Sequence, residues 1–277
     1  MLISISDDFD LDAIARSGQC FRWEKTPDSA YRIPHGKKCL YIRPEGKETY
    51  SLDCSGDEFE NIWSAYFDLK EDYRTVRERI DPNRDPFLSR AAESCRGIRI
   101  LRQDLWEVLI TFIISQNRNI PAIARSVDIL CSLAGDACVD SRGREFFTFP
   151  APESIAAMSG EALDACRLGY RDRYVRASAE AVSTGNFSLS ALEELDDEQA
   201  MSELCSLPGV GVKVASCVAL FGLHRLDSFP VDTWIRRVLK NEYPEGYPRQ
   251  EYSPYNGVYQ QYMFAYYRGG SDARAIS

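Results

Sequence analysis

Lys213 and Asp232 are the two residues of this chain whose type and setting best suit covalent chemistry. Lys213 follows a Leu-Pro-Gly-Val-Gly turn at residues 207–211 and lies in an otherwise apolar run that extends to Leu220. Asp232 ends a Phe-Pro-Val-Asp sequence and precedes a helix-forming stretch. A neutral lysine amine is a nucleophile, and an ionised carboxylate stabilises positive charge that develops beside it. The stretch between the two residues is long enough for a helix, a turn and a return to the same cleft.

Each of the two residues also has an ordinary structural explanation. A lysine on a core helix can run its stem along apolar neighbours and keep its amine in water. An aspartate before a helix is a common N-cap, worth about 1 kcal/mol. The cap is compatible with a chemical role for Asp232, because the helix dipole favours an ionised carboxylate there. For Lys213, apolar neighbours favour the neutral amine that nucleophilic attack requires.

The turn at residues 207–211 is a candidate binding element for an anion. Gly209 and Gly211 permit positive φ angles and the close approach of another backbone. The helix that follows begins with N–H groups that have no partner within the helix, and such a helix start suits a DNA phosphate. Taken alone, this turn is a weak indication of function.

Together, the turn, Lys213 and the Pro-Val-Asp sequence that ends at Asp232 resemble the helix-hairpin-helix, Gly/Pro-rich loop, Asp superfamily of base-excision DNA glycosylases. With a lysine at position 213, the chain resembles the bifunctional branch of this superfamily, whose members also cut the strand. Within that branch it resembles the 8-oxoguanine DNA glycosylases. The resemblance covers nearly the whole chain. It implies an enzyme that flips 8-oxoguanine out of double-stranded DNA, releases it with Lys213 as nucleophile and nicks the strand by β-elimination. Asp232 would stabilise positive charge on the sugar.

The resemblance also implies a base-binding pocket. Residues 17–23, Ser-Gly-Gln-Cys-Phe-Arg-Trp, resemble the family segment whose glycine carbonyl, here that of Gly18, accepts the N7–H found only on the oxidised base. Cys217 and Phe264 match the residues on the two faces of the base, although without their neighbours both would be plain core residues. The other pocket residues that match are Gln260, on the Watson–Crick edge, Pro230 and Asp232.

The DNA-contacting residues implied by the resemblance lie in three loops. Asn117 matches the asparagine that fills the space left by the flipped base, and its ordinary explanation is a capped turn. Tyr170 and Arg171 match a wedge tyrosine and an arginine that contacts the orphaned partner base. Gly209 and Gly211 belong to the hairpin that would hold a phosphate.

Three positions depart from the family pattern. Arg118 interrupts the asparagine run after Asn117, and Ala122 stands where animal members have the arginine that reads the opposite cytosine. We therefore predict a weaker preference for cytosine opposite the lesion. Trp234 stands where those members have a histidine near the lesion's phosphate, so that contact is not expected to be conserved. His35 and His224 match no role and are interpreted as surface or turn residues.

Composition limits the cofactors and the partners. The formal charge of −9 excludes a basic coat over the whole surface but not a local DNA site. The nine cysteines include no Cys-x-x-Cys pair, and none follows Cys217, so the iron–sulfur cluster of some relatives cannot form. Their scatter, with Cys131, Cys166 and Cys205 in apolar segments, predicts reduced core thiols in an intracellular protein.

No cofactor is implied for catalysis. A structural cation held by the hairpin carbonyls is compatible with the resemblance, but nothing in the sequence indicates it. No run of 18 apolar residues exists and the first residues do not resemble a signal peptide, so no membrane association is expected. We expect a monomer.

The patterns predict an α+β fold in two parts. Residues 1–84 are expected to form an antiparallel β domain with flanking helices, with strands near 21–23, 31–33, 39–42 and 50–52. Residues 85–277 are expected to contain helices and loops only, with a loop at 146–150, as a helical helix-hairpin-helix glycosylase domain. The clusters of arginines at 84–102 and 167–176 would ordinarily be solvated helix faces.

Two other functions remain open at this stage. One is a glycosylase for another damaged purine, such as an alkylated base, against which Lys213 counts. The other is a non-catalytic helix-hairpin-helix DNA-binding module, which would need only the hairpin and not Lys213, Asp232, Gly18 and Phe264 together.

Overall fold

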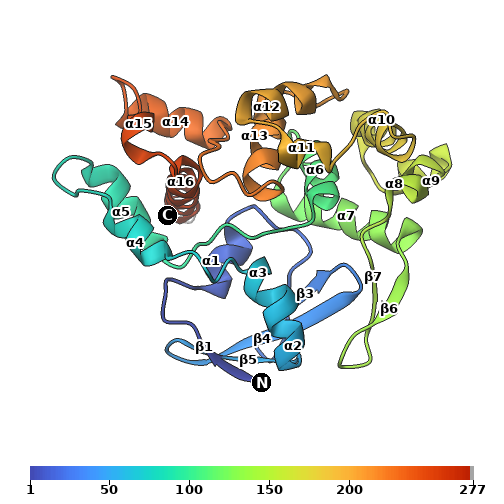
Figure 1. Cartoon of the computed structure of the whole chain (residues 1–277), viewed down its shortest axis with the longest axis horizontal. Helices are drawn as coiled ribbons and strands as arrows, with labels where there is room; N and C mark the ends of the chain where they lie inside the picture. Colours follow the sequence, from blue (N-terminus) through green and yellow to red (C-terminus); the bar gives the residue numbers. More distant parts are fainter. Residues whose placement is uncertain (275–277) are drawn as a thin grey trace.

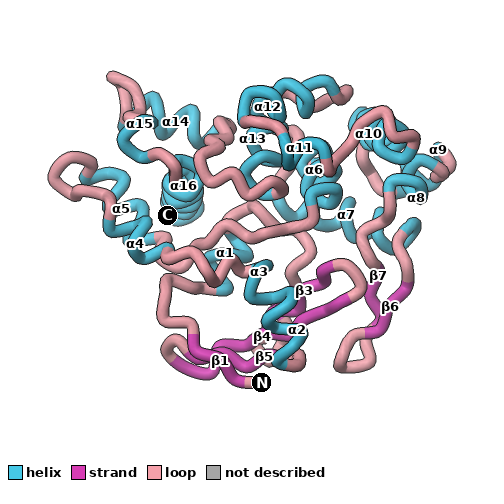
Figure 2. The backbone as a smooth tube through the Cα atoms, viewed as in Figure 1, coloured by secondary structure: helices cyan, strands magenta, loops and turns pink. Residues whose placement is uncertain are grey.

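The computed structural model describes residues 1–274 and has a β-sheet at one end and a larger helical region at the other (Figure 1). Strands gather below the helices, and a second small hairpin descends beside the sheet, as Figure 2 shows. The predicted α+β class, with an antiparallel sheet before a mainly helical region, is confirmed. None of the helices in residues 1–274 combines the length and the apolar composition that a membrane crossing requires.

The sheet is antiparallel and has the strand order β1-β5-β4-β3-β2. Its strands are β1 (Leu2–Ser4), β2 (Glu24–Lys25), β3 (Tyr31–His35), β4 (Lys38–Gly46) and β5 (Thr49–Leu52). The strand predicted at residues 21–23 is wrong, since β2 begins at Glu24. The physical reason is that Phe21 packs against Phe112 of the helical region and Arg22 pairs with Glu107, which draws this segment off the sheet.

Short helices cover one face of the sheet. They are α1 (Leu11–Arg16), α2 (Gly56–Glu58), the π-helical turn η1 (Phe59–Trp63) and α3 (Ser64–Tyr66). Ile14, Trp63 and Phe67 are fully buried against Ile33 and Leu40 of the sheet and form its core. Asp10 starts α1 by accepting a hydrogen bond from Ala13 N, as an N-cap should.

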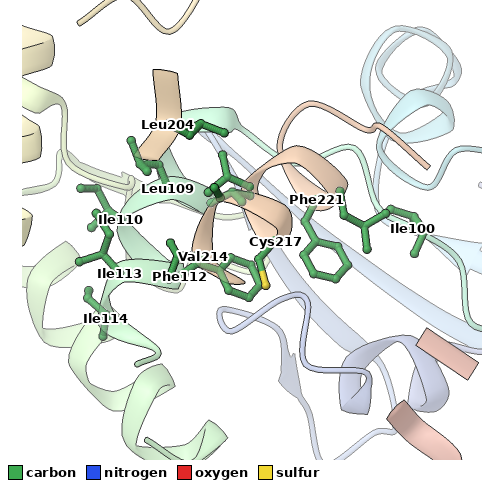
Figure 3. Close-up of a cluster of buried hydrophobic side chains, with 14 of the residues drawn as sticks. Ile100, Leu109, Ile110, Phe112, Ile113, Ile114, Leu204, Val214, Cys217 and Phe221 are labelled. Carbon is green, nitrogen blue, oxygen red and sulfur yellow. The ribbon is translucent and has the colours of Figure 1, made fainter. Parts of the chain in front are cut away.

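The helical region supplies most of the cavity walls described below. Its elements are α4 (Tyr73–Glu78), α5 (Pro86–Ser94), α6 (Leu105–Ile114), α7 (Ile120–Ala134), α8 (Pro152–Ala156), α9 (Gly160–Ala165), η2 (Gly169–Arg171), α10 (Asp172–Ser183), α11 (Ala191–Glu194), α12 (Asp197–Ser206), α13 (Val212–Phe221), α14 (Thr233–Glu242), α15 (Arg249–Tyr252) and α16 (Asn256–Arg274). Helix α6 packs along α13, and α16 lies against α5 and α14. The apolar seam between α6 and α13 contains Phe112, Val214 and Phe221 (Figure 3).

A two-stranded sheet, β6 (Ala137–Val139) with β7 (Glu145–Phe147), contradicts the expectation of helices and loops only. Residues 146 and 147 are therefore strand rather than loop. The hairpin is docked on the main sheet, because its turn residue Asp140 accepts hydrogen bonds from Arg32 and Tyr41. Burial would raise the pKa of Asp140, but these bonds and two backbone N–H groups outweigh it and lower that pKa.

The buried residues form two clusters whose division does not coincide with the predicted boundary at 84/85. The cluster under the sheet ends at Phe67, apart from Leu101. Tyr73, Val76 and Ile80 already belong to the core of the helical region. Helix α4 therefore packs with the helical region, and the boundary at 84/85 stays a prediction.

A buried arginine joins the two regions. Arg99 has no exposed surface, so the interpretation of its cluster as a solvated helix face is wrong at this position. Its guanidinium lies over the Tyr73 ring, 4.2 Å from the centroid. Its hydrogen bonds go to the carboxylate of Asp7 and to the backbone carbonyls of Asp8, Phe67, Asp68 and Glu71.

His224 also contradicts its interpretation as a surface residue. It lies in the loop after α13, with φ of 55°, but its side chain is 8% exposed and its Nε2 lies 3.0 Å from Asp68. Burial alone would raise the pKa of Asp68. The hydrogen bonds and positive charges of His224 and Arg102 outweigh the effect of burial, so the pKa of Asp68 is lowered. The loop after α13 is thus tied to the end of the sheet region.

All nine cysteines are free thiols, which agrees with the sequence-based expectation. Cys131, Cys166 and Cys217 are buried. Cys205 is exposed, so its predicted place in the core is wrong. It occupies the solvent-facing side of α12, whose buried residues are Ala200 and Leu204.

We predict that Arg99→Met lowers the free energy of unfolding by about 3 kcal/mol, because it leaves a carboxylate and several carbonyls without their buried donor. Urea unfolding measures the change. Arg90→Met is the matched control: Arg90 is exposed on α5, and the expected change is within about 0.5 kcal/mol. Equal effects of the two substitutions would contradict a structural role for Arg99.

Candidate active site

One cavity of about 130 Å³ lies where the sheet region meets α6, α13 and α16. It brings together both predicted catalytic residues and every predicted base-binding residue. They are Gly18, Lys213, Cys217, Pro230, Asp232, Gln260 and Phe264. The remaining wall is mostly aromatic and aliphatic and includes Phe21, Phe112, Ile120 and Phe221.

The hairpin before α13 places Lys213 in the first turn of that helix. Helix α12 ends at Ser206, and Gly211 is the N-cap residue of α13. Helix α13 is buried from Val214 to Phe221, and Lys213 is the only charged residue in its sequence. The Lys213 amine lies 5.3 Å from the centroid of the Phe112 ring. The helix therefore directs an amine toward a mostly apolar cavity wall.

Only one of the two hairpin glycines uses the conformational freedom expected of both. Gly209 has φ of +81°, and a Cβ built there would lie 2.3 Å from Tyr174 Cγ. Gly211 has φ of −97°, and a Cβ there would meet nothing within 4 Å. Gly209 is thus required by the fold, whereas Gly211 leaves open space beside the start of α13.

Asp232 caps α14 and lines the cavity at the same time. One of its carboxylate oxygens accepts a hydrogen bond from Ile235 N at 2.8 Å, which fixes the side chain at the positive end of the helix. The loop that leads to it is anchored by Ser228, whose hydroxyl donates to the carbonyl of Ser216. The cap and a cavity position are therefore compatible, as predicted.

Cys217 lies one turn after Lys213 and is fully enclosed. Burial raises the pKa of this thiol, Lys213 opposes the rise and Asp232 adds to it. The net direction is upward, so the thiol is neutral and presents a polarisable apolar surface to the cavity. Lys213, Cys217 and Asp232 all line the same cavity.

Gly18 is held over the cavity by its neighbour Gln19, which is 1% exposed. The Gln19 side chain donates to Ser17 Oγ and to the carbonyl of Arg99, and it accepts from Leu101 N. Gly18 itself has φ of +79°, a left-handed conformation that favours glycine. A Cβ at Gly18 would lie 3.4 Å from Phe264 Cε1, so the two residues are in direct contact across the regions.

Three residues of α16 face the cavity. Gln260, Gln261 and Phe264 are spaced so that they share one broad side of the helix. Gln260 Nε2 donates to the carbonyl of Pro230 at 3.0 Å, and Gln261 Nε2 donates to Gln260 Oε1 at 2.9 Å. This pair of amides connects α16 with the loop that carries Asp232.

The predicted DNA-contacting residues lie together at the link between α6 and α7. Asn117 has φ of 52°, and its amide donates to the hydroxyl of Tyr170, which is 47% exposed. Gln116 connects this link with the hairpin, since its amide donates to the carbonyl of Gly209 at 3.1 Å. Three segments that are distant in sequence therefore form one cluster.

Arg171 differs from the other predicted DNA contacts because it is only 7% exposed. Its guanidinium lies over the Tyr170 ring and donates to the backbone carbonyls of Gln116 and Leu168. In this arrangement Arg171 positions the α6–α7 link and Tyr170, and its donors are not presented to a DNA base. The interpretation of its cluster as a solvated face also fails here.

Arg118 lines the cavity and does not extend from the surface. Its Nη1 donates to Ser126 Oγ at 2.9 Å. Burial lowers the pKa of Arg118, and the positive charge of Arg171 adds to that effect. Trp234 does not line the cavity, and Arg237 lies over its ring at 5.0 Å.

Comparison with known proteins agrees with this geometry. Residues 1–109 match the model of the 8-oxoguanine DNA glycosylase N-terminal domain, and residues 110–246 match that of the HhH-GPD superfamily base excision DNA repair proteins. N-glycosylase/DNA lyase OGG1 of Arabidopsis thaliana is 33% identical over 81% of this chain. The chain belongs to the 8-oxoguanine DNA glycosylase family. It spans 64% of the length of the Arabidopsis relative.

Solved structures of this glycosylase family share the fold. The Clostridium acetobutylicum 8-oxoguanine glycosylase/lyase, in complex with double-stranded DNA containing cytosine opposite to 8-oxoG, superposes with a TM-score of 0.89 and 30% identity over 98% of both chains. The 3-methyladenine DNA glycosylase of Archaeoglobus fulgidus superposes with a TM-score of 0.77 at 19% identity, which shows the fold alone. Since glycosylases of different names share this architecture, the substrate must be argued from the cavity.

Three glutamines of this chain were missed as site residues in the sequence. Gln19 clamps the Gly18 segment, Gln116 joins the α6–α7 link to the hairpin, and Gln261 lies beside Gln260 in the cavity wall. The available indication was a polar amide within an otherwise apolar or aromatic stretch, because a buried amide must have hydrogen-bond partners. Among the described residues, no group of three or more His, Cys, Asp and Glu residues could hold a metal ion.

We predict that Gly209→Ala lowers the free energy of unfolding of this chain by about 1–3 kcal/mol, because the new methyl group would overlap Tyr174 and because φ of +81° is strained for alanine. Gly211→Ala is the matched control, with an expected change within about 0.5 kcal/mol. Thermal or urea unfolding of both variants measures the difference. Similar losses of unfolding free energy in the two variants would show that the contact between Gly209 and Tyr174 is not what makes glycine necessary in the hairpin.

Proposed function

We propose that this chain removes 8-oxoguanine from double-stranded DNA and then cuts the strand at the resulting site. The observation that carries the proposal is the single cavity that unites an amine, a carboxylate and a base-sized apolar wall drawn from both regions of the chain. A non-catalytic hairpin module would have no reason to assemble Lys213 and Asp232 beside Gly18 and Phe264.

The chemistry begins with attack of the neutral Lys213 amine on C1′ of the deoxyribose. The C1′–N9 bond breaks, and the base leaves with the bonding electrons and takes up a proton. The sugar gains positive character in the transition state, and the ionised carboxylate of Asp232 stabilises it. This role suits Asp232 because its N-cap bond at the positive end of α14 holds the carboxylate in the cavity wall.

Strand cutting uses the same amine. Opening of the sugar ring breaks the bond between C1′ and the ring oxygen and leaves a protonated Schiff base between Lys213 and C1′. The imine makes the 2′ hydrogen acidic. Loss of that proton and departure of the 3′ phosphate, with the electrons of the C3′–O3′ bond, complete β-elimination and nick the strand.

Base selection in this proposal depends on the Gly18 carbonyl and on the residues that cover the two faces of the base. The Gly18 carbonyl accepts N7–H of 8-oxoguanine, whereas unmodified guanine has an acceptor at N7 and would be repelled. Cys217, as a neutral thiol, and Phe264 cover the two faces of the base, and Gln260 contacts its Watson–Crick edge. Pro230 completes the wall beside Asp232. Extruding the base costs a few kcal/mol, which these contacts must offset.

The surface around the cavity supports binding to a duplex. Asn117 and the exposed ring of Tyr170 are the groups we assign to the disrupted base stack. The hairpin around Gly209 and Gly211 offers unpaired N–H groups to a phosphate. A cation held by the hairpin carbonyls remains part of the proposal; Gly209 O already accepts from Gln116, which restricts the carbonyls free for it.

We predict that Lys213→Gln eliminates the covalent adduct that borohydride traps between the native protein and 8-oxoguanine DNA. Strand cutting in single turnover should fall by at least about a thousandfold, because the nucleophile is lost. Lys240→Gln, at an exposed lysine of α14, is the matched control and should trap normally. Failure of the native protein to form any adduct would favour a non-catalytic module or a glycosylase that does not use an amine.

We predict a weak preference for cytosine opposite the lesion. Neither nearby arginine is presented to the opposite strand, since Arg118 bonds to Ser126 within the cavity wall and Arg171 is buried. A bidentate arginine contact is worth about 1–3 kcal/mol, so excision rates with the four opposite bases should lie within about tenfold. Ala122→Arg should raise the preference for cytosine. A strong preference in the native protein would refute this prediction.

A further inference from the structure

We propose that Gln261 is a specificity-determining residue whose side-chain oxygen accepts a hydrogen bond from the 2-amino group of the extruded base. The inference rests on the proposed function and deepens it. It assigns a second glutamine to the Watson–Crick edge, beside Gln260.

The orientation of both amides is fixed by the carbonyl of Pro230. A backbone carbonyl can only accept, so the group that faces it must be the NH₂ of Gln260, at 3.0 Å. Gln260 Oε1 then points away and accepts from Gln261 Nε2 at 2.9 Å. The chain of bonds therefore has one direction, and it ends at Gln261 Oε1.

That last oxygen is buried and has no hydrogen-bond partner among the described residues. Gln261 is 4% exposed and lines the cavity. An unpaired buried acceptor costs about 1–3 kcal/mol unless a donor meets it. The protein itself thus leaves this acceptor unsatisfied at a residue that lines the base cavity, and a ligand donor that reaches it would remove that cost.

The two glutamines together match the edge of a guanine-type base. Gln260 retains one N–H donor and one lone pair, and Gln261 retains one N–H donor and adds a second acceptor. The guanine edge presents one acceptor, O6, and two donors, N1–H and the 2-amino group. The two acceptors of the wall match the two donors of this edge, and a remaining amide N–H can meet O6. An adenine-type edge, with an acceptor at N1 and an amino donor, would leave one wall acceptor unpaired.

The test compares 8-oxoguanine with 8-oxohypoxanthine, which lacks only the 2-amino group, in otherwise identical duplexes. Gln261→Met keeps the length of the side chain and removes the acceptor. Its single-turnover excision of 8-oxoguanine should fall by about tenfold, equivalent to about 1.4 kcal/mol, while excision of 8-oxohypoxanthine changes by less than about twofold. Gln261→Leu, a second variant, should show the same selective loss.

The matched control is Tyr262→Phe. The Tyr262 hydroxyl is also buried without a hydrogen-bond partner among the described residues, but this side chain does not line the cavity. Its removal should leave the ratio of the two rates unchanged. Thermal unfolding of each variant identifies any loss that comes from folding alone, because such a loss would lower both rates together.

Equal losses on the two substrates, or no loss on either, would overturn the assignment to the 2-amino group. These results would leave the proposed function intact as long as the native protein excises 8-oxoguanine and is trapped by borohydride. Absence of both activities in the native protein would instead reject the proposed function itself.

Discussion

The cavity depends on the hydrogen bonds of Gln19. Its amide and its backbone carbonyl bind the segment at residues 17–21 to the chain at residues 99–103, where the sheet region meets the helical region. Gly18 is thereby held against Phe264 of α16. Without this clamp the cavity would lack its wall from the sheet region, and Lys213 would face an open groove between α6 and α13.

Four arginines of this chain serve its interior. Arg99 and Arg171 are buried, and the side chains of Arg22 and Arg32 are each 9% exposed and paired with acidic groups or carbonyls. They help to hold the segments around the cavity in place. The formal charge of −9 gives the chain as a whole no attraction to DNA over a distance. Close contacts, such as the hairpin N–H groups, gain importance for the same reason.

Sequence patterns predicted the local elements well where side-chain periodicity or a cap determines them. The cap at Asp232 and the apolar run from Lys213 to Leu220, which forms α13, are examples. The resemblance placed the cavity residues, because the motif spans both Lys213 and Asp232. These predictions used information that lies within short stretches of the chain.

Long-range contacts account for what the sequence did not predict. Residues 21–23 have strand composition, but their partners Phe112 and Glu107 are in α6. The β6–β7 hairpin is held by Arg32, more than a hundred residues earlier. Arg171 looks like a surface cation until Gln116 supplies its acceptor. A buried amide such as Gln261 can be noticed in the sequence, but its bonding direction depends on Pro230.

Gln116 has a thermodynamic consequence for the proposed complex with DNA. Its carbonyl accepts from Arg171, and its amide donates to Gly209, so the strained Asn117 is ordered before any duplex arrives. A flexible link would lose conformational entropy on association, and that loss weakens affinity. Here the folding of the protein has already met that entropic cost, so more of the contact energy is left to distort the double helix.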